Sequence, residues 1–306
     1  MEQKRERSRR EFLSDMTLLA GGAAALASGM SASAAEAGPA DLIVVSGEDP
    51  KAMVKKAIEE MGGMKKFVSK GDVVVIKPNI AWVRAPELAA NTNPAVVAGL
   101  VELALDAGAK EVKVFDRTIQ NPERCYATSG IAEAAKAAGA KVLFTSDMQT
   151  ATIPVKNGVH MKESAVWKDA LECDCYINVP VAKHHRMSQT TCAMKNHMGL
   201  TADDRFRAWH SSLDQAIADF ASAFTPKLNV IDAYRVMLRG GPGGGSLEDL
   251  QTLKKCIVGV NQASIDAYAA TLFNRQPDQI RYIALAGKLG VGEIDLAKLK
   301  IKEVTV

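Results

Sequence analysis

A run of four apolar β-branched residues at 73–76 most constrains the fold of this chain. A strand that is apolar at every position is covered on both faces, as in a parallel sheet packed between helices. Similar runs recur with helical stretches between them. Strands are expected at 42–45, 73–76, 112–115, 142–144, 175–179, 228–231 and 256–260, and helices at 50–61, 94–107, 131–138, 213–224 and 264–273. This alternation predicts an α/β fold with a mostly parallel open sheet and helices on both faces.

Local signals place the boundaries of several elements. Asp49 and Asn93 each precede a proline, which is the pattern of an N-cap residue followed by a first-turn proline. Residues 152–159 are expected to form a β-hairpin around Asn157-Gly158. Residues 154–172 lack a clear period, so a seam between two lobes is expected near them within the domain 35–306.

The first 34 residues have the pattern of an export signal. Arg9-Arg10 is followed by an apolar run at 16–30 and by Ala32-Ser33-Ala34, which fits a cleavage site. The twin arginine predicts recognition by the twin-arginine translocase. The protein is therefore expected in the periplasm or another extracytoplasmic compartment. Because this route carries folded proteins, it also favours a bound cofactor.

Composition limits the classes of partner and cofactor. The formal net charge is +3, and the Lys and Arg residues are scattered, so no nucleic-acid partner is expected. Five cysteines at 125, 173, 175, 192 and 256 form no C-x-x-C-x-x-C run, so the usual framework of a four-iron cluster is missing. Cys173 and Cys175 are expected on one strand, pointing the same way and not joined to each other.

Polar residues follow four of the predicted strands. Ligands of open α/β sheets bind beyond the carboxyl ends of the strands, so these side chains are candidate ligand-binding groups. They are Lys77 and Asn79, Asp116, Lys183 and His185, and Asp232.

The segment 183–199, KHHRMSQTTCAMKNHMG, is the densest cluster of candidate site residues. Its second half, 190–198, is expected to be a helix on which Thr191 and Lys195 lie one turn apart. A hydroxyl and an ammonium presented together suit a carboxylate or a phosphate. Asn196 adds an amide that both donates and accepts.

Two other features leave alternatives open. A metal ion is one hypothesis for the cofactor, with His185 and Asp232 as its ligands, although no tight zinc spacing exists. The glycine-rich segment 239–246, RGGPGGGS, is either a linker or a mobile loop that closes over a ligand. Asp266 either sits in the first turn of a helix or faces the site.

An ordered set of motifs resembles the domain of unknown function family 362. The set comprises K-P-N at 77–79, T-N-P at 92–94, N-V-P at 178–180, Lys183, His185, T-x-x-x-K-N-x-x-G at 191–199, Asp232, the glycine loop and Asp266. The resemblance covers roughly residues 70–292. Many relatives carry a ferredoxin-like cysteine module that this chain lacks, and one lysine of the P-K-x-K-x-H motif is replaced here. The resemblance implies a fold and a site, not a reaction.

These observations predict an exported enzyme that acts on an anionic small molecule or a bound cofactor. Lys77, Lys183 and Lys195 would neutralise negative charge, and His185 would transfer a proton. Asp116 or Asp232 would orient that histidine or hold a metal. Two alternatives stay open: an accessory redox protein that serves a partner protein with an iron–sulfur cluster or metal, and a non-catalytic periplasmic ligand binder.

Overall fold

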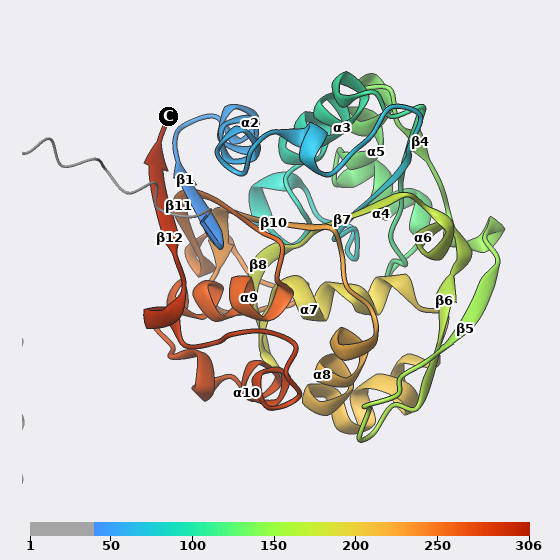
Figure 1. Cartoon of the computed structure of the whole chain (residues 1–306), viewed down its shortest axis with the longest axis vertical. Helices are drawn as coiled ribbons and strands as arrows, with labels where there is room; N and C mark the ends of the chain where they lie inside the picture. Colours follow the sequence, from blue (N-terminus) through green and yellow to red (C-terminus); the bar gives the residue numbers. More distant parts are fainter. Residues whose placement is uncertain (1–39) are drawn as a thin grey trace, which may run out of the picture. The chain divides into compact units, whose positions relative to one another are not determined.

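The computed structural model describes residues 40–306, which lie in one compact unit (Figure 1). Ten strands form one sheet in the order β12-β1-β11-β10-β7-β2-β3-β4, with β8 joined to β10 and β9 joined to β8. These strands are β1 (Leu42–Ser46), β2 (Val73–Pro78), β3 (Glu111–Val114), β4 (Lys141–Val142), β7 (Cys175–Val179), β8 (Val181–His185), β9 (Gln189–Thr191), β10 (Leu228–Met237), β11 (Leu250–Gly259) and β12 (Ile301–Thr305). A separate two-stranded sheet contains β5 (Thr150–Pro154) and β6 (Glu163–Trp167).

Most strand pairs of the large sheet are parallel, which confirms the predicted α/β class. The antiparallel pairs are β1–β11, β10–β11 and β8–β9. Strands β10 and β11 are longer than expected and are joined through the glycine-rich loop without a crossover helix. A parallel return needs such a crossover, so β11 has to run back antiparallel.

Helices cover both faces of the sheet, as the sequence predicts. The α-helices are α2 (Pro50–Glu60), α3 (Pro94–Ala107), α4 (Pro122–Thr128), α5 (Ile131–Ala137), α6 (Lys168–Glu172), α7 (Ala193–Asn196), α8 (Leu213–Ala223), α9 (Gln262–Thr271) and α10 (Arg281–Lys288). Short 3-10 turns are η1 (Met64–Lys66), η2 (Pro86–Leu88), η3 (Thr145–Asp147), η4 (His197–Leu200), η6 (His210–Ser212), η7 (Leu247–Asp249), η8 (Pro277–Gln279) and η9 (Leu296–Lys298), and η5 (Arg205–Trp209) is a π turn. Among the described residues, no helix has the length and apolar character needed to cross a bilayer.

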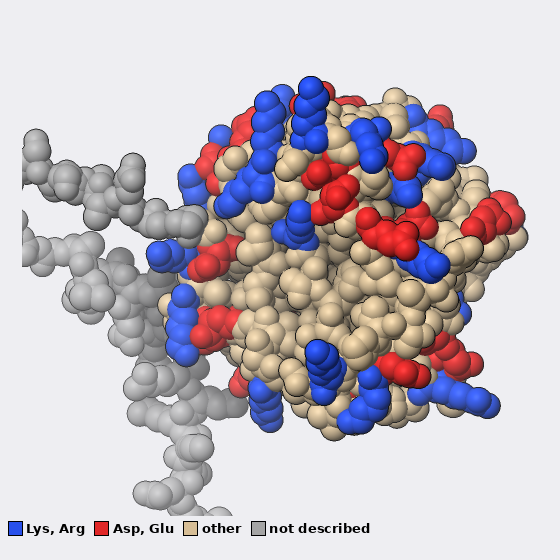
Figure 2. All heavy atoms as spheres, turned by 45° about the vertical axis from the view of Figure 1, so that its right-hand side comes forward, with Lys and Arg blue, Asp and Glu red and all other residues tan. Residues whose placement is uncertain are grey.

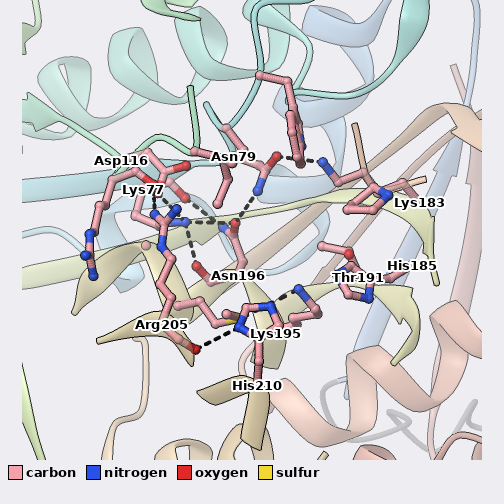
Figure 3. Close-up of a pocket in the computed structure, with 17 residues that line it drawn as sticks. Lys77, Asn79, Asp116, Lys183, His185, Thr191, Lys195, Asn196, Arg205 and His210 are labelled. Atoms are coloured by element: carbon pink, nitrogen blue, oxygen red, sulfur yellow. Dashed lines mark hydrogen bonds and ion pairs between the residues drawn. The ribbon is translucent and has the colours of Figure 1, made fainter. Parts of the chain in front are cut away.

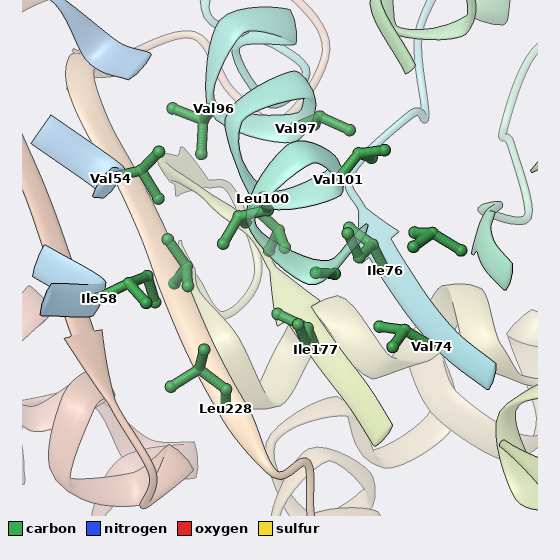
Figure 4. Close-up of a cluster of buried hydrophobic side chains, with 14 of the residues drawn as sticks. Val54, Ile58, Val74, Ile76, Val96, Val97, Leu100, Val101, Ile177 and Leu228 are labelled. Carbon is green, nitrogen blue, oxygen red and sulfur yellow. The ribbon is translucent and has the colours of Figure 1, made fainter. Parts of the chain in front are cut away.

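The alternation of side chains along β2 divides the core between the two faces. Val74 and Ile76 pack with α2 and α3 in one apolar cluster (Figure 4), whereas Val75 packs with α8 in another. Asp49 and Asn93 cap α2 and α3 as predicted, since each side chain accepts a backbone N–H of the first turn. These caps fix where both helices start behind the sheet.

The hairpin predicted at 152–159 exists with different boundaries. Strands β5 and β6 pair from Thr150↔Trp167 to Pro154↔Glu163, so the loop is longer than a two-residue turn at Asn157-Gly158. Asp219 of α8 explains the longer loop, because its carboxylate accepts the backbone N–H groups of residues 159–161. The stretch 154–172, where a seam between lobes was expected, lies within this single compact unit.

All five cysteines are unpaired thiols. Cys175 lies on β7 and is buried, as expected. Cys173 is only half-buried and ends helix α6 instead of starting the strand, so the prediction that both share one strand is wrong. The Cys173 thiol donates to the Ala170 carbonyl oxygen (3.4 Å), a contact typical of the end of a helix.

Charges of both signs are mixed on the face of the molecule in Figure 2. Lys and Arg side chains alternate there with Asp and Glu, mostly around the edge of the view. Neither positive nor negative side chains dominate this face. The charge distribution inside the pocket described next is very different.

Candidate functional site

A pocket of about 310 Å³ lies at the carboxyl edge of β2 and β3, beside β8, β9 and α7 (Figure 3). It contains eight of the nine site residues predicted from the sequence. These are Lys77, Asn79, Asp116, Lys183, His185, Thr191, Lys195 and Asn196. The structure therefore brings these eight side chains together around one pocket at the carboxyl ends of the strands, where ligands of open α/β sheets bind.

Asp232 is the predicted site residue that the structure places elsewhere. Its carboxylate accepts the backbone N–H groups of Asn93 (2.8 Å) and Tyr234 (3.1 Å), and it borders a separate small depression. Burial raises the pKa of Asp232 to about 6. Strand β10 continues past Asp232 to Met237 instead of ending there, so this carboxylate never reaches the pocket.

Thr191 and Lys195 line the pocket, but they are not one turn apart on a helix. Thr191 ends strand β9 and pairs with Lys183 of β8 across the antiparallel ladder. Helix α7 starts only at Ala193, because the Asp266 carboxylate accepts the backbone N–H groups of Ala193 (2.6 Å) and Met194 (3.0 Å). Asp266 is thus a capping group that acts from another helix, a contact that local sequence does not encode.

A buried ion pair forms the floor of the pocket. The Lys77 ammonium lies 2.8 Å from Asp116 Oδ1 and also donates to the backbone oxygen (2.6 Å) and Oδ1 (2.8 Å) of Asn196. Asp116 Oδ2 accepts the Ile80 backbone N–H (2.7 Å). Burial lowers the pKa of Lys77, while Asp116 opposes that shift. The two carboxylate oxygens of Asp116 are therefore used by Lys77 and the Ile80 backbone, and Asp116 does not orient His185.

Gly199 lets this ion pair approach the backbone closely. A Cβ at this position would lie 1.8 Å from Asp116 Oδ1 and 2.7 Å from Lys77 Nζ. Gly199→Ala should displace the pair and lower the free energy of unfolding by about 1–3 kcal/mol, as overpacking usually does. Urea denaturation measures this loss. A loss of less than about 0.5 kcal/mol, which is typical of substitutions at the protein surface, would show that Lys77 and Asp116 can shift to accommodate the added methyl group at no cost.

A chain of buried amides fixes the orientation of Asn196. Its Nδ2 donates to Asn178 Oδ1 (2.9 Å), and Asn178 Nδ2 donates to Asn229 Oδ1 (3.0 Å) and to the Ala193 carbonyl (2.9 Å). Asn196 Oδ1 must then face Lys77, since the amide nitrogen is used on the other side. Asn178, the asparagine of the N-V-P motif, therefore fixes the orientation of Asn196 although it does not line the pocket itself.

Lys183 is also held by oxygen atoms of the protein. Its ammonium donates to Asn79 Oδ1 (2.9 Å) and to the Ala90 carbonyl oxygen. Burial lowers the pKa of Lys183 well below its ordinary value, and the nearby Lys195 adds to this effect. Both Lys77 and Lys183 therefore act as fixed, bonded groups of the pocket wall.

Lys195 differs from the other two lysines because it has no oxygen partner among residues 40–306. Its nearest polar contact is the Met198 sulfur, at 3.6 Å. The side chain is 9% exposed, so water cannot fully solvate the ammonium. Burial lowers the pKa of Lys195 to about 7, Arg205 and Lys77 lower it further, and Asp214 opposes the shift. The predicted lysine of the site is therefore a buried amine with no oxygen atom of residues 40–306 within bonding distance, and the Asp214 carboxylate compensates its charge only from farther away.

His185 is held in one neutral form. Its Nδ1 accepts the backbone N–H groups of Met187 and Ser188, both at 3.2 Å, which leaves the ring proton on Nε2. Burial, followed by Lys195 and Lys183, lowers the pKa of His185 to about 2. At neutral pH this imidazole can donate a hydrogen bond, but it is a poor proton acceptor.

Among the pocket residues that were not predicted from the sequence, four carry aromatic or charged side chains: Trp82, Arg117, Arg205 and His210. Arg205 Nη2 donates to the Arg117 carbonyl (2.7 Å), and His210 Nδ1 donates to the Arg205 carbonyl (2.7 Å). Arg117 directly follows Asp116, so the strand-end rule could have found it. Arg205 and His210 come from a π turn and the 3-10 turn after it, for which the sequence has no periodic signal.

The glycine-rich segment forms one wall of the pocket. Pro242 lines the cavity, and a Cβ on Gly243 would lie 2.2 Å from the Trp82 ring. Arg84 Nε donates to the Gly243 carbonyl (3.0 Å). In this structure the loop therefore packs against the site residues and is not a free linker.

The donor set of the pocket favours an anion. Its cationic side chains are Lys77, Arg117, Lys183, Lys195 and Arg205, and Asp116 is the one carboxylate among its described lining residues. The buried Thr191 hydroxyl and Arg205 Nε have no hydrogen-bond partner in the described chain. Within residues 40–306, no group of three or more His, Cys, Asp and Glu side chains has the arrangement of a metal site. The predicted pair of metal ligands, His185 and Asp232, is not completed by a third residue.

Comparison with known proteins identifies relatives of this chain. The family described as Domain of unknown function (DUF362) matches residues 74–271. A thylakoid-associated protein of Synechocystis sp. is 25% identical over 252 residues, which is 78% of this chain and 75% of that protein. The lactate racemase apoprotein from Thermoanaerobacterium thermosaccharolyticum superposes with a TM-score of 0.42 and 12% identity, over 71% of this chain and 54% of that one. This chain thus spans about half of the length of that structure.

Proposed function

The chain belongs to the domain of unknown function 362 family, and on that premise we propose that it is an enzyme that binds a small anion and moves a proton on it. The anion carries a carboxylate or a phosphate. The observation that carries the proposal is Lys195, a buried amine without an oxygen partner in the described chain. An anionic group of the ligand would supply that partner.

Charge balance supports an anionic ligand. Asp116 offsets one cation of the pocket, Lys77. The other four cations are left without a carboxylate within salt-bridge distance in residues 40–306: Arg117, Lys183, Lys195 and Arg205. Burying unbalanced charge is costly, and a bound anion relieves that cost for several cations at once. The volume of about 310 Å³ lies at the lower end of ligand pockets, which favours a small molecule.

The chemistry of Lys195 supports proton transfer. In the unliganded pocket, where the pKa of Lys195 is about 7, a large fraction of the amine is neutral at physiological pH, and this neutral form can accept a proton from the molecule that binds. The proton then resides on Lys195 Nζ, where the anionic group of the ligand stabilises it. His185 Nε2–H, the Thr191 hydroxyl and Arg205 Nε–H have no hydrogen-bond partner in the described part of the chain and would orient the ligand. In this proposal Lys195 takes the proton-transfer role that the sequence suggested for His185.

Native mass spectrometry of untagged protein and calorimetric titration with acetate and inorganic phosphate test the proposal. We expect a retained small anion, and binding of at least one probe at pH 7. A chemical change of the retained molecule, seen as altered mass or as deuterium taken up from D2O, would establish catalysis. Binding without any change would leave a non-catalytic ligand binder, and no binding at all would refute the anion site.

We further propose that the protein is exported by the twin-arginine route. Residues 1–34, which contain Arg9 and Arg10, lie outside the described residues, so this proposal rests on the sequence pattern. Changing both arginines to lysine should leave the precursor in the cytoplasm, as cell fractionation would detect. Normal export of that double variant would mean that another route recognises the signal.

A further inference from the structure

We propose that the anion bound in this pocket carries an apolar group, either a short alkyl chain or a flat ring, that lies at the pocket mouth against Trp82 and Ile119. This inference rests on the proposed function, because it describes the rest of the same ligand. It assigns the substrate class as small amphipathic carboxylates or phosphates.

The most deeply buried lysines of the lining lie apart from three of its apolar side chains, which sit nearer solvent together with Arg117, Arg205 and His210. Lys77 and Lys183 are each 1% exposed, so the charged floor lies deep in the molecule. Ile119, which also lines the pocket, is 49% exposed, and Trp82 and Pro242 are partly buried. A ligand that enters with its anionic end first can therefore place its other end against these three apolar side chains on one side of the mouth.

Both the backbone and the indole ring of Trp82 are held in place by contacts within the protein. Its backbone N–H donates to Asn91 Oδ1 (3.1 Å), and Asn91 Nδ2 donates back to the Trp82 carbonyl (2.9 Å). The backbone of Gly243 packs against the indole ring so closely that an added Cβ would lie 2.2 Å from it. Because the ring is already fixed, binding costs little side-chain entropy.

Ile119 completes the apolar mouth from a different segment. Its backbone N–H donates to the Ala81 carbonyl (3.0 Å), which ties the segment after β3 to the segment after β2. Ala81 and Met198 add further apolar surface to the lining. A bare anion such as phosphate would contact the floor alone and leave this surface in water, whereas an apolar substituent would cover it.

Matched pairs of probes test the inference: acetate with phenylacetate, and inorganic phosphate with phenyl phosphate. Calorimetric titration gives the affinity ratio within each pair. We expect the larger member of at least one pair to bind about tenfold more tightly, as burial of a ring at an apolar mouth should allow. Trp82→Ala should reduce that ratio about fivefold or more. Ile119→Ala should also reduce it, and this exposed position is suited to a variant that folds normally.

The control is Val159→Ala, which shortens another exposed apolar side chain that does not line the pocket. It should leave the ratio unchanged. Equal affinity for both members of each pair, or ratios that neither Trp82→Ala nor Ile119→Ala alters, would overturn the inference while the anion site stands. If no member of either pair binds the wild-type protein, the proposed function fails and this inference fails with it.

Discussion

Replacement of Lys195 by methionine is expected to weaken binding of the pocket's anion by on the order of 2–5 kcal/mol, the cost of removing one partner from a desolvated charge pair. Methionine fills nearly the same volume without the ammonium, so the change isolates the charge. Calorimetric titration of wild type and variant with whichever of acetate or phosphate binds measures the loss. Equal affinity of the two proteins would remove Lys195 from the binding site.

The same substitution should change stability in a pH-dependent way. The folded protein releases the Lys195 proton near pH 7, whereas the unfolded chain keeps it to about pH 10.5. Below pH 7 both states are protonated, so the full penalty of burying the ammonium is present, on the order of 5 kcal/mol. Between pH 7 and 10.5 the unfolded state binds more protons, so stability of the wild type rises with pH. Unliganded Lys195→Met should therefore be more stable than wild type at pH 6, and this advantage should shrink towards pH 10.

Lys288→Met is the matched control for both measurements. Lys288 is an exposed residue of α10, outside the pocket. Its replacement should change binding and stability by less than about 0.5 kcal/mol. If Lys195→Met destabilises the unliganded protein at pH 6, then Lys195 has a compensating partner and the proposal loses its main support.

The second large effect is expected for Asp116→Asn. The variant keeps an oxygen that can accept the Ile80 N–H but removes the negative charge that faces Lys77 at 2.8 Å. Breaking a buried ion pair from one side typically costs about 3–5 kcal/mol, since a buried charge remains without its partner. Urea denaturation of wild type and variant measures this difference.

The surface pair Lys51–Glu102 provides the comparison. Its atoms are 2.6 Å apart, closer than those of Lys77 and Asp116, but both side chains are more than 40% exposed. Glu102→Gln should cost about 0–1 kcal/mol, because water solvates the remaining lysine. Equal costs for the two substitutions would show that burial does not govern the strength of the Lys77–Asp116 pair.

Most of the polar residues around the pocket could be predicted from sequence, but their hydrogen-bond partners and the directions of their pKa shifts could not. Strands such as β2 and β7 are visible as runs of apolar residues, and the residues that follow β2 and β3 reach the pocket as the strand-end rule requires. Which group is a base depends on burial and on hydrogen-bond partners. Two backbone N–H groups hold His185 as a donor, and Lys195 has no oxygen partner within residues 40–306.

The errors at Thr191 and Asp232 have a common physical cause. The sequence predicted a helix through Thr191 and a strand end at Asp232 from local composition alone. Long-range contacts decided otherwise: the Asp266 carboxylate caps α7 at Ala193, and β10 extends beyond Asp232 along β11. Local propensity is a weak preference that such contacts readily override.

The sequence by itself determined the α/β alternation, the caps of α2 and α3, and the edge of the sheet at which polar residues collect. These features depend on short-range steric and hydrogen-bonding preferences and on the period of apolar residues. Only the tertiary structure decided that Arg205 and His210 join the pocket, that Gly199 admits the Lys77–Asp116 pair, and that Lys195 lacks a partner in the described chain. Those outcomes depend on distances between residues far apart in the chain and on exclusion of water, neither of which has a signature in local sequence.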